Sequence, residues 1–296
     1  MSLAMNTECI LCHINKNIAT ARKLGDEATA TAFARELMQL HLQLPADANS
    51  AMLGPATNAL FTKYYGLSQD RYRVEKENAN RFVLERLDEI RQRVESAADP
   101  LLAGLQFSIL GNYLDFSALQ GQISFQELEQ MMDQALEMKL DPVCYAAFCQ
   151  ELEKSKTLLY ITDNAGEIGF DRIFGEVLAR HYPHLAITFC ARGKIAQNDA
   201  TREDAALMGI PFPVIDNGND VAGTEFTLLS REAREAIAAA DVILAKGMGN
   251  TETMLGCGYN VYYAFLVKCA RFASYFQAPM MQPLFLREKD QPKPKL

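Results

Sequence analysis

The sequence lacks the features that define several large classes of protein. Its longest apolar stretches, such as 157–162 and 239–245, fall far short of the roughly 20 residues that a membrane-spanning helix needs. It also lacks a block of basic residues, and 37 acidic against 29 basic side chains give a formal net charge of −8. Such a chain is a poor candidate for binding nucleic acid or an anionic membrane. Of its 296 residues 49% are hydrophobic, which predicts a globular protein of one large domain or two smaller ones.

We also expect neither an export signal nor a disulfide framework. The N-terminus has no positive region followed by a long apolar core, and the seven cysteines are an odd number spread through the chain. We therefore expect reduced thiols and a cytoplasmic protein. Cys9, Cys12 and His13 form a Cys-x-x-Cys-His run that could bind a metal or do redox chemistry. No second cysteine pair has a suitable spacing, so a structural role is the favoured interpretation.

Several phosphate-handling motifs are also missing. There is no G-x-x-x-x-G-K-[ST] loop, and no G-x-G-x-x-G follows the first predicted strand, which excludes P-loop and dinucleotide-binding proteins. Ala165 stands two positions after Asp163, where phosphotransferases that form an aspartyl-phosphate have a second aspartate. A serine nucleophile elbow is absent too.

The first half of the sequence has the pattern of helices separated by turns. Apolar residues recur at a helical period over 19–44 and 71–98, and shorter helices are predicted over 101–113, 124–136 and 142–154. We therefore predict a helical domain over residues 1–154 that caps the site and selects the substrate.

The second half alternates between strands and helices. Short apolar runs at 157–162, 185–190, 213–215 and 241–245 predict buried strands, with helices after Gly166 and over 201–208 and 224–240. This alternation predicts a doubly wound, mostly parallel, Rossmann-like α/β domain over residues 155–296, with a loose tail from 287.

Polar residues and glycines follow each of the four predicted strands, at the edge where such sheets bind ligands. The oxygens of Asp163, Asn164 and Asp199 suit Mg²⁺ or Mn²⁺ better than zinc. Lys246 could neutralise an anionic oxygen, and Gly166 opens a helix whose N-terminus favours phosphate. Each also has a plain structural interpretation: both aspartates could cap helices, and Lys246 could be a solvated strand end.

Three motifs together resemble one family, the metal-dependent damage-control phosphatases, also called acidic-residue methyltransferase-like proteins. They are Thr162-Asp163-Asn164-Ala165-Gly166-Glu167, Asn198-Asp199-Ala200-Thr201 and Lys246-Gly247-Met248-Gly249-Asn250. Two further elements resemble the prokaryotic stand-alone branch, namely Gly111-Asn112-Tyr113-Leu114-Asp115-Phe116 and Asp70-x-Tyr72-x-x-x-Lys76. The resemblance covers nearly the whole chain.

The resemblance implies a role for each matching position. Asp163, Asn164 and Asp199 match the ligands of one divalent cation, which could be Mg²⁺, Mn²⁺, Co²⁺ or Ni²⁺. Asp163, Asn164 and Lys246 are the implied catalytic set. The expected phosphate and substrate contacts are Gly166, Glu167, Asn198, Gly247, Asn250, Glu252 and Lys268. Asn112 and Asp115 of the helical part are candidates for contact with the organic part of the substrate, and a buried turn of the helical bundle is the equally good alternative. The sequence lacks the Arg-Thr that precedes the equivalent of Lys268 in other branches, which implies a different substrate preference.

The expected activity is hydrolysis of a small phosphomonoester, such as a sugar phosphate or a related damaged metabolite. The attacking group could be water or Asp163, and the oligomeric state is open. Two alternatives are a carboxyl methyltransferase that uses S-adenosylmethionine and a binding protein without catalysis. The Asp163–Asn164 pair after the first strand, with Arg192 and Lys194 after the second, disfavours the methyltransferase.

Overall fold

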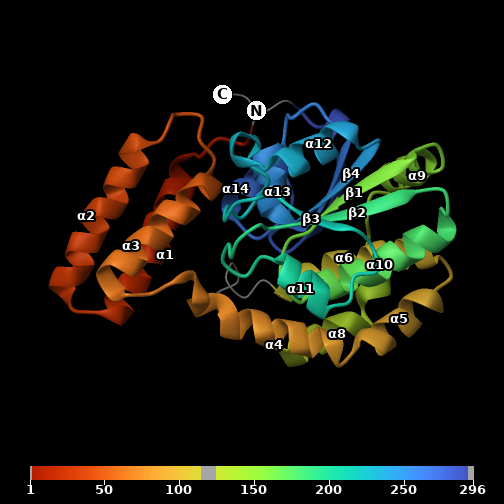
Figure 1. Cartoon of the computed structure of the whole chain (residues 1–296), viewed down its shortest axis with the longest axis horizontal. Coiled ribbons are helices and arrows are strands. Elements are labelled where there is room, and N and C mark those ends of the chain that lie inside the picture. The colour runs from red at the N-terminus through yellow and green to blue at the C-terminus, as the bar shows by residue number, and fades with distance from the viewer. Residues whose placement is uncertain (1, 115–124, 293–296) are drawn as a thin grey trace.

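The centre of the molecule is a six-stranded sheet (Figure 1). The structure is a computed structural model, and it describes residues 2–114 and 125–292. The strand order is β3-β2-β1-β4-β5-β6. The strands are β1 (Thr157–Ile161), β2 (Ala186–Ala191), β3 (Val214–Asp216), β4 (Val242–Lys246), β5 (Val261–Leu266) and β6 (Pro283–Arg287). All neighbouring pairs are parallel except β5 and β6, which are antiparallel. The predicted doubly wound, mostly parallel α/β fold is therefore confirmed.

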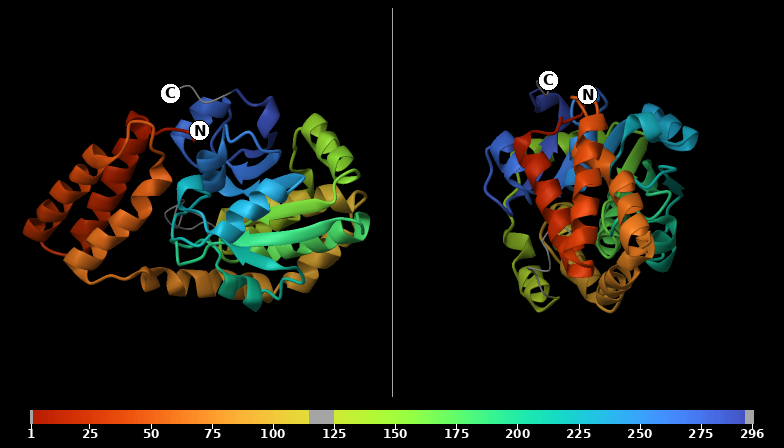
Figure 2. Two further views of the ribbon diagram at one scale, coloured as in Figure 1. Left: turned by 45° about the horizontal axis from the view of Figure 1, so that its top comes forward. Right: turned by 90° about the vertical axis from the view of Figure 1, so that its left-hand side faces the viewer.

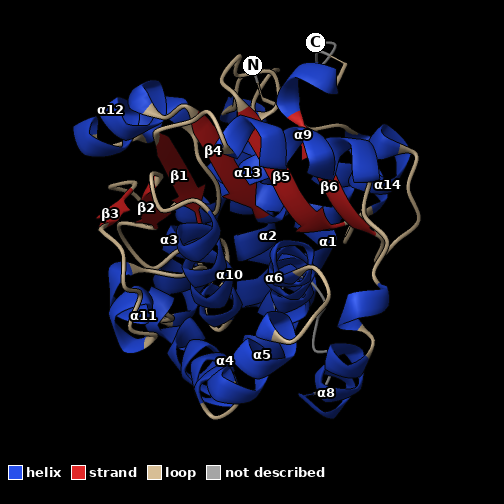
Figure 3. Ribbon diagram, turned by 90° about the vertical axis from the view of Figure 1, so that its right-hand side faces the viewer, coloured by secondary structure: helices blue, strands red, loops and turns tan. Residues whose placement is uncertain are grey.

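Helices cover both faces of the sheet (Figure 3). One face, which includes Leu158 and Tyr160 of β1, shares a core with α6 (Pro100–Gly111) and α10 (Glu167–His181). The other face, which includes Leu159 and Ile161, shares a core with α12 (Arg231–Ala239), α13 (Gly247–Met254) and α14 (Ala270–Phe276). Alternate residues of β1 thus enter opposite cores, as the pleat of a strand requires.

A second layer of helices lies outside α6 and α10. It contains α4 (Arg73–Leu84), α5 (Leu87–Glu95) and α8 (Phe125–Asp133). The same apolar core runs from these helices through α9 (Pro142–Leu152) to the sheet. The short α11 (Arg202–Leu207) precedes β3. Much of the helical half of the sequence therefore packs onto the sheet, and the division into 1–154 and 155–296 stays a prediction.

The first three helices form a unit with a core of their own. They are α1 (Thr7–Leu24), α2 (Glu27–Gln43) and α3 (Leu53–Tyr65), and residues such as Phe33 and Phe61 fill the space between them. The unit stands beside the sheet, and α4 leads from it along the edge of the molecule (Figure 2). The short helices η1 (Ser50–Met52) and η2 (Gln69–Tyr72) flank α3. Within the described residues, no helix is long and apolar enough to cross a membrane.

Several predicted boundaries were wrong. The helix expected over 19–44 is divided at Gly25, because Asp26 caps a new helix by accepting from the Thr29 amide at 2.7 Å. The helix expected over 71–98 is divided between α4 and α5, and only Arg231–Ala239 of 224–240 is α-helical. The apolar runs of β5 and β6 were not predicted as strands, and β6 extends to Arg287, where a loose tail was expected.

Candidate active site

The loops after β1 and β2 meet at the carboxyl edge of the sheet. Asp163 and Asn164 follow β1, and Asp199 lies in the loop after β2. Asn164 and Asp199 pair as an isolated antiparallel bridge, and the Ala200 amide donates to the Asp163 carbonyl oxygen at 2.7 Å. These backbone hydrogen bonds hold the two loops against each other. The structure therefore brings together the three residues that the sequence suggested as metal ligands.

A small pocket of about 130 Å³ opens at this place. Five of the predicted site residues line it: Asp163, Asn164, Asn198, Asp199 and Lys268. The other lining residues are Lys16, Gln197, Ala222, Met248 and Gly249. Lys16 comes from α1, so the three-helix unit contributes to the wall of a pocket whose other lining residues follow the strands of the sheet.

Two asparagine amides fix one oxygen of the Asp163 carboxylate. Asn164 Nδ2 donates to Asp163 Oδ2 at 2.7 Å, and Asn112 Nδ2 donates to it at 2.8 Å. Both amides also donate to Glu167 Oε2, each at 2.8 Å. By contrast, Asp163 Oδ1 and Asn164 Oδ1 accept no hydrogen bond from the described residues. These two oxygens belong to pocket-lining side chains and are available to a ligand.

Lys246 lies behind the pocket, not in its wall. Its side chain is 0% exposed, and Nζ donates to Glu167 Oε1 at 2.7 Å, to Asp171 Oδ1 at 2.8 Å and to the Ser108 carbonyl oxygen at 2.9 Å. An ammonium group has three protons, so these contacts use all of them. Burial raises the pKa of Asp171 to about 6, although Lys246 lowers it. The structure thus gives Lys246 the environment of a residue that neutralises buried carboxylates.

Two charged residues of this region were missed as site residues. The first is Asp171. It could have been predicted from its position four residues after Glu167, which places both carboxylates on the same face of the helix. Arg192 is the other: its Nε donates to Asp199 Oδ2 at 2.6 Å, and its Nη2 lies 3.8 Å from Asp163 Oδ1. Arg192 directly follows β2, so its strand-end position was the available signal.

Neighbouring carboxylates strongly affect the electrostatics of the pocket. The pKa of Asp163 is raised well above its ordinary value, first because burial disfavours the charged form and then because Asp199 and Glu167 repel it. Lys268 and Arg192 act in the opposite direction and do not cancel the effect. A positive ion at this point would relieve the repulsion between the carboxylates.

Lys268 and the first turn of α13 supply the positive side of the pocket. Lys268 lies just after β5, and its Nζ donates to the Asn112 carbonyl oxygen. Met248 and Gly249, at the start of α13, also line the pocket. Gly247 has a φ of 78°, and a Cβ atom there would overlap the Asp163 carboxylate. Only glycine allows helix and carboxylate to approach this closely.

The remaining predicted residues support the site or lie away from it. Asn250 is buried and bonds the ends of β1 and β4, donating to the Thr162 carbonyl oxygen at 3.0 Å and to that of Lys246 at 2.6 Å. Gly166 donates its amide to Asn80 Oδ1 of α4 at 2.7 Å. Glu252 accepts from the Ser50 amide at 2.6 Å and is not part of the pocket wall. Asp115 lies outside the described residues.

The donor set fits a hard divalent cation. Asp163, Asn164 and Asp199 offer carboxylate and amide oxygens toward one pocket, and such ions prefer oxygen ligands. No group of three or more histidine, cysteine, aspartate or glutamate side chains in residues 2–114 and 125–292 is arranged to hold a metal. A cation bound by these residues would therefore need the amide oxygen of Asn164 as its third protein ligand, beside Asp163 and Asp199.

The fold and these motifs place the protein in a known family. The chain belongs to the family of the damage-control phosphatase ARMT1-like domain, whose family model matches residues 5–283. An uncharacterized protein of Methanocaldococcus jannaschii is 29% identical over 280 residues, which cover 90% of both chains. The predicted family is therefore confirmed, and its description supports a phosphatase.

Two relatives are named for this activity. Damage-control phosphatase PH1575 of Pyrococcus horikoshii is 32% identical over 188 residues, which cover 62% of this chain and 64% of the relative. A damage-control phosphatase of Archaeoglobus fulgidus is 31% identical over 189 residues, covering 63% and 64%. The crystal structure of PH1575 superposes with a TM-score of 0.81 at 25% identity, over 96% of this chain and 99% of that one. The shared fold thus extends beyond the 188 residues over which the two sequences match.

Proposed function

We propose that this protein hydrolyses small phosphomonoesters with the help of one divalent cation. The observation that carries the proposal is the composition of the small pocket. Asp163, Asn164 and Asp199 line it with two carboxylates and one side-chain amide, and Lys268 lines the same space. An anionic phosphate fits between a cation and a lysine, whereas acidic oxygens alone would repel it.

Asp163, Asn164 and Asp199 would hold the cation through side-chain oxygens. A divalent cation supplies the Lewis-acid charge that polarises a phosphoryl oxygen. Asn112 and Asn164 hold Asp163 Oδ2, which leaves Oδ1 as the oxygen for the cation. Arg192 does the same for Asp199 through Oδ2. Rigid ligands of this kind reduce the reorganisation that would otherwise accompany the reaction.

The phosphate itself would meet Lys268 and the start of α13. Backbone amides in the first turn of a helix have no intrahelical partner, and the helix dipole favours an anion there. Met248 and Gly249 of this turn line the pocket, and their backbone amides are the groups that we expect to meet the phosphate. Lys268 would offset charge that develops on the phosphoryl oxygens. Lys246 would act indirectly, by keeping Glu167 in position behind Asp163.

The test is phosphate release by protein stripped with a chelator and then given Mg²⁺, Mn²⁺, Co²⁺ or Ni²⁺ in turn. A panel of sugar phosphates and other small phosphomonoesters provides the substrates. We expect metal-dependent release that is lost in Asp163→Asn. The control is Asp216→Asn, which changes an aspartate at the end of β3 that does not line the pocket. Release that persists in Asp163→Asn contradicts the proposed site, and retention of a phosphomonoester without release indicates a binding protein.

A further inference from the structure

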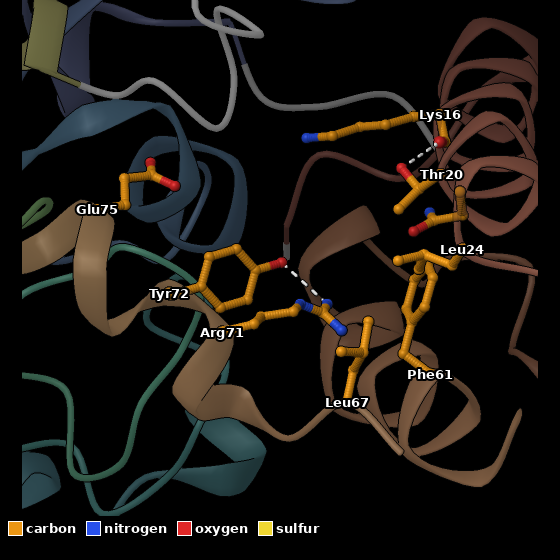
Figure 4. A pocket seen from close by; sticks show the side chains of 9 residues that line it. Lys16, Thr20, Leu24, Phe61, Leu67, Arg71, Tyr72 and Glu75 are labelled. Atoms are coloured by element: carbon orange, nitrogen blue, oxygen red, sulfur yellow. Dashed lines mark hydrogen bonds between the residues drawn. The ribbon is translucent and has the colours of Figure 1, made fainter. Parts of the chain in front are cut away.

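A second and larger pocket lies beside the candidate active site. It has a volume of about 470 Å³ and opens between the three-helix unit and the segment that leads into α4 (Figure 4). Its walls come from α1, α3, η2 and the start of α4. The residues that line it are Lys16, Asn17, Thr20, Leu24, Phe61, Leu67, Arg71, Tyr72 and Glu75.

One residue connects the two pockets. Lys16 lines the small pocket beside Asp163 and also the large one, so the two spaces are neighbours. In Figure 4 its side chain extends from α1 across the pocket, away from the helix. At about 130 Å³, the small pocket is below the roughly 300 Å³ at which sites for organic ligands begin. A phosphate fills a space of that size, and the organic part of the ester must extend beyond it.

Arg71 gives the large pocket its chemical character. Its guanidinium lies 4.6 Å from the ring centre of Phe61 and 4.8 Å from that of Tyr72. Nη2 donates to Asn58 Oδ1 at 2.6 Å and to the Tyr72 hydroxyl at 3.0 Å. Nε and Nη1 make no hydrogen bond within the described residues. Arg71 is thus held by rings and hydrogen bonds while part of its donor fork remains unused.

A guanidinium held in this way is suited to bind an anion. Its planar fork matches a carboxylate or a phosphate, and a fixed side chain loses little entropy on binding. Asn17, Thr20 and Glu75 add groups that can bond hydroxyls, and Leu24, Leu67 and Phe61 supply apolar surface. The pocket therefore combines one anion-binding end with walls that suit a short polar chain.

We propose that this pocket binds the leaving group of the substrate and that Arg71 recognises a second anion on it. The substrate class is then a phosphomonoester with a carboxylate or a second phosphate at its far end. This inference rests on the proposed phosphatase function, because the small pocket must hold the reacting phosphate. Lys16 lies between the two ends and favours a doubly anionic molecule over a singly anionic one.

The experiment compares matched esters in wild-type protein and in Arg71→Gln. One ester ends in an alcohol, a second has a carboxylate at that position, and a third has a second phosphate. We expect Arg71→Gln to lower kcat/KM for one or both doubly anionic esters by about tenfold to a hundredfold, as loss of a charge-assisted hydrogen bond implies. The alcohol ester should change by less than about twofold, since it has no second negative charge to pair with the guanidinium.

Two further variants make the result specific. Arg22→Gln removes an exposed arginine of α1 that pairs with Glu27 and does not line the pocket. This variant should leave kcat/KM for all three esters unchanged. Arg71→Lys keeps the charge but not the fork, so it should lose part of the preference even if the glutamine variant folds poorly. The carboxylate and bisphosphate esters show which anion the pocket takes.

The outcomes separate this inference from the function on which it rests. If wild-type protein releases phosphate and Arg71→Gln lowers kcat/KM equally for all three esters, or for none, the leaving-group pocket is overturned and the phosphatase stands. If wild-type protein with each metal releases phosphate from no ester, both proposals are overturned. A decrease in kcat/KM of Arg71→Gln that is confined to the doubly anionic esters supports both proposals.

Discussion

Asn112 Nδ2 lies 2.8 Å from Asp163 Oδ2, so the end of α6 holds a carboxylate that follows β1. From the sequence, Asn112 was a candidate for contact with the organic part of the substrate, and a buried turn of the helical bundle was the alternative. In the structure Asn112 is 0% exposed, and its amide also bonds Glu167 at 2.8 Å. The contact therefore makes Asn112 a residue that positions Asp163.

We predict that Asn112→Ala weakens both stability and activity. It removes one of the two buried amide donors that Asp163 Oδ2 and Glu167 Oε2 each have, which costs about 1–3 kcal/mol. Phosphate release should fall for all substrates alike, because the Asp163 carboxylate loses part of its support. Urea unfolding and release assays on several esters measure the two effects. The control Asn78→Ala removes an exposed contact with Arg81 and should change neither. A change in preference among substrates, without lost stability, would restore the substrate-contact role.

A second prediction concerns Lys246. Lys246→Met leaves two buried carboxylates, Glu167 and Asp171, without their shared cation. Breaking a buried ion pair in this way destabilises a protein by about 3–5 kcal/mol, so we expect a large shift in the denaturation midpoint. Adding Asp171→Asn removes one of the two charges and should recover part of the loss. A stable Lys246→Met protein that only fails to release phosphate would support direct contact with the substrate instead.

The sequence was sufficient for the fold class and for the meeting of Asp163, Asn164 and Asp199. Parallel strands end at a common edge, so residues that follow β1 and β2 must lie close together. The sequence was insufficient to predict the direction of the Lys246 side chain, because a lysine at the end of a strand can point toward a ligand or toward the protein core. The choice depends on Asp171 and Ser108, which come from helices that the pattern could not place.

The breaks within the predicted helices show a similar limit. Apolar spacing continued through Gly25 and through Glu85, and the periodicity contains no signal for a change of helix direction. Neither the large pocket nor Arg71 was predicted, because its walls combine four separate elements near the N-terminus. Contacts between elements, and not local propensity, determine such features.

A third prediction is a pH effect on stability that arises from His13. Burial, together with the nearby His41 and Lys16, lowers its pKa from 6.5 to about 4. Between these two values the unfolded chain binds a proton and the folded chain does not, so folding loses stability as the pH falls. His13 therefore contributes stability that is fully present above about pH 6.5 and is lost as the pH falls to about 4.

The size of this effect is up to about 3 kcal/mol, since each pKa unit is worth about 1.4 kcal/mol. We expect the difference in unfolding free energy between wild type and His13→Gln to decrease steadily over that range. Denaturation curves at several pH values measure it, and an NMR titration of the His13 ring gives the pKa directly. A ring that titrates near 6.5 in the folded protein would contradict the explanation.

The last prediction compares two glycines with nearly the same positive φ angle. Gly247 has a φ of 78° and Gly258 a φ of 81°, so alanine at either position carries the strain of a left-handed residue, about 1 kcal/mol. Their surroundings differ: a Cβ atom at Gly247 would overlap the Asp163 carboxylate, whereas at Gly258 it would meet nothing within 4 Å.

Both alanine variants should therefore lose stability, with the larger loss in Gly247→Ala, and only Gly247→Ala should lose phosphate release. The reason is that the methyl group pushes Asp163 away from the position in which Asn112 and Asn164 hold it. Thermal unfolding and metal-dependent release, measured side by side on the two variants, separate backbone strain from damage to the site. If Gly247→Ala stays as active as Gly258→Ala, the position of the Asp163 carboxylate does not limit the reaction, and the site proposed around it is wrong.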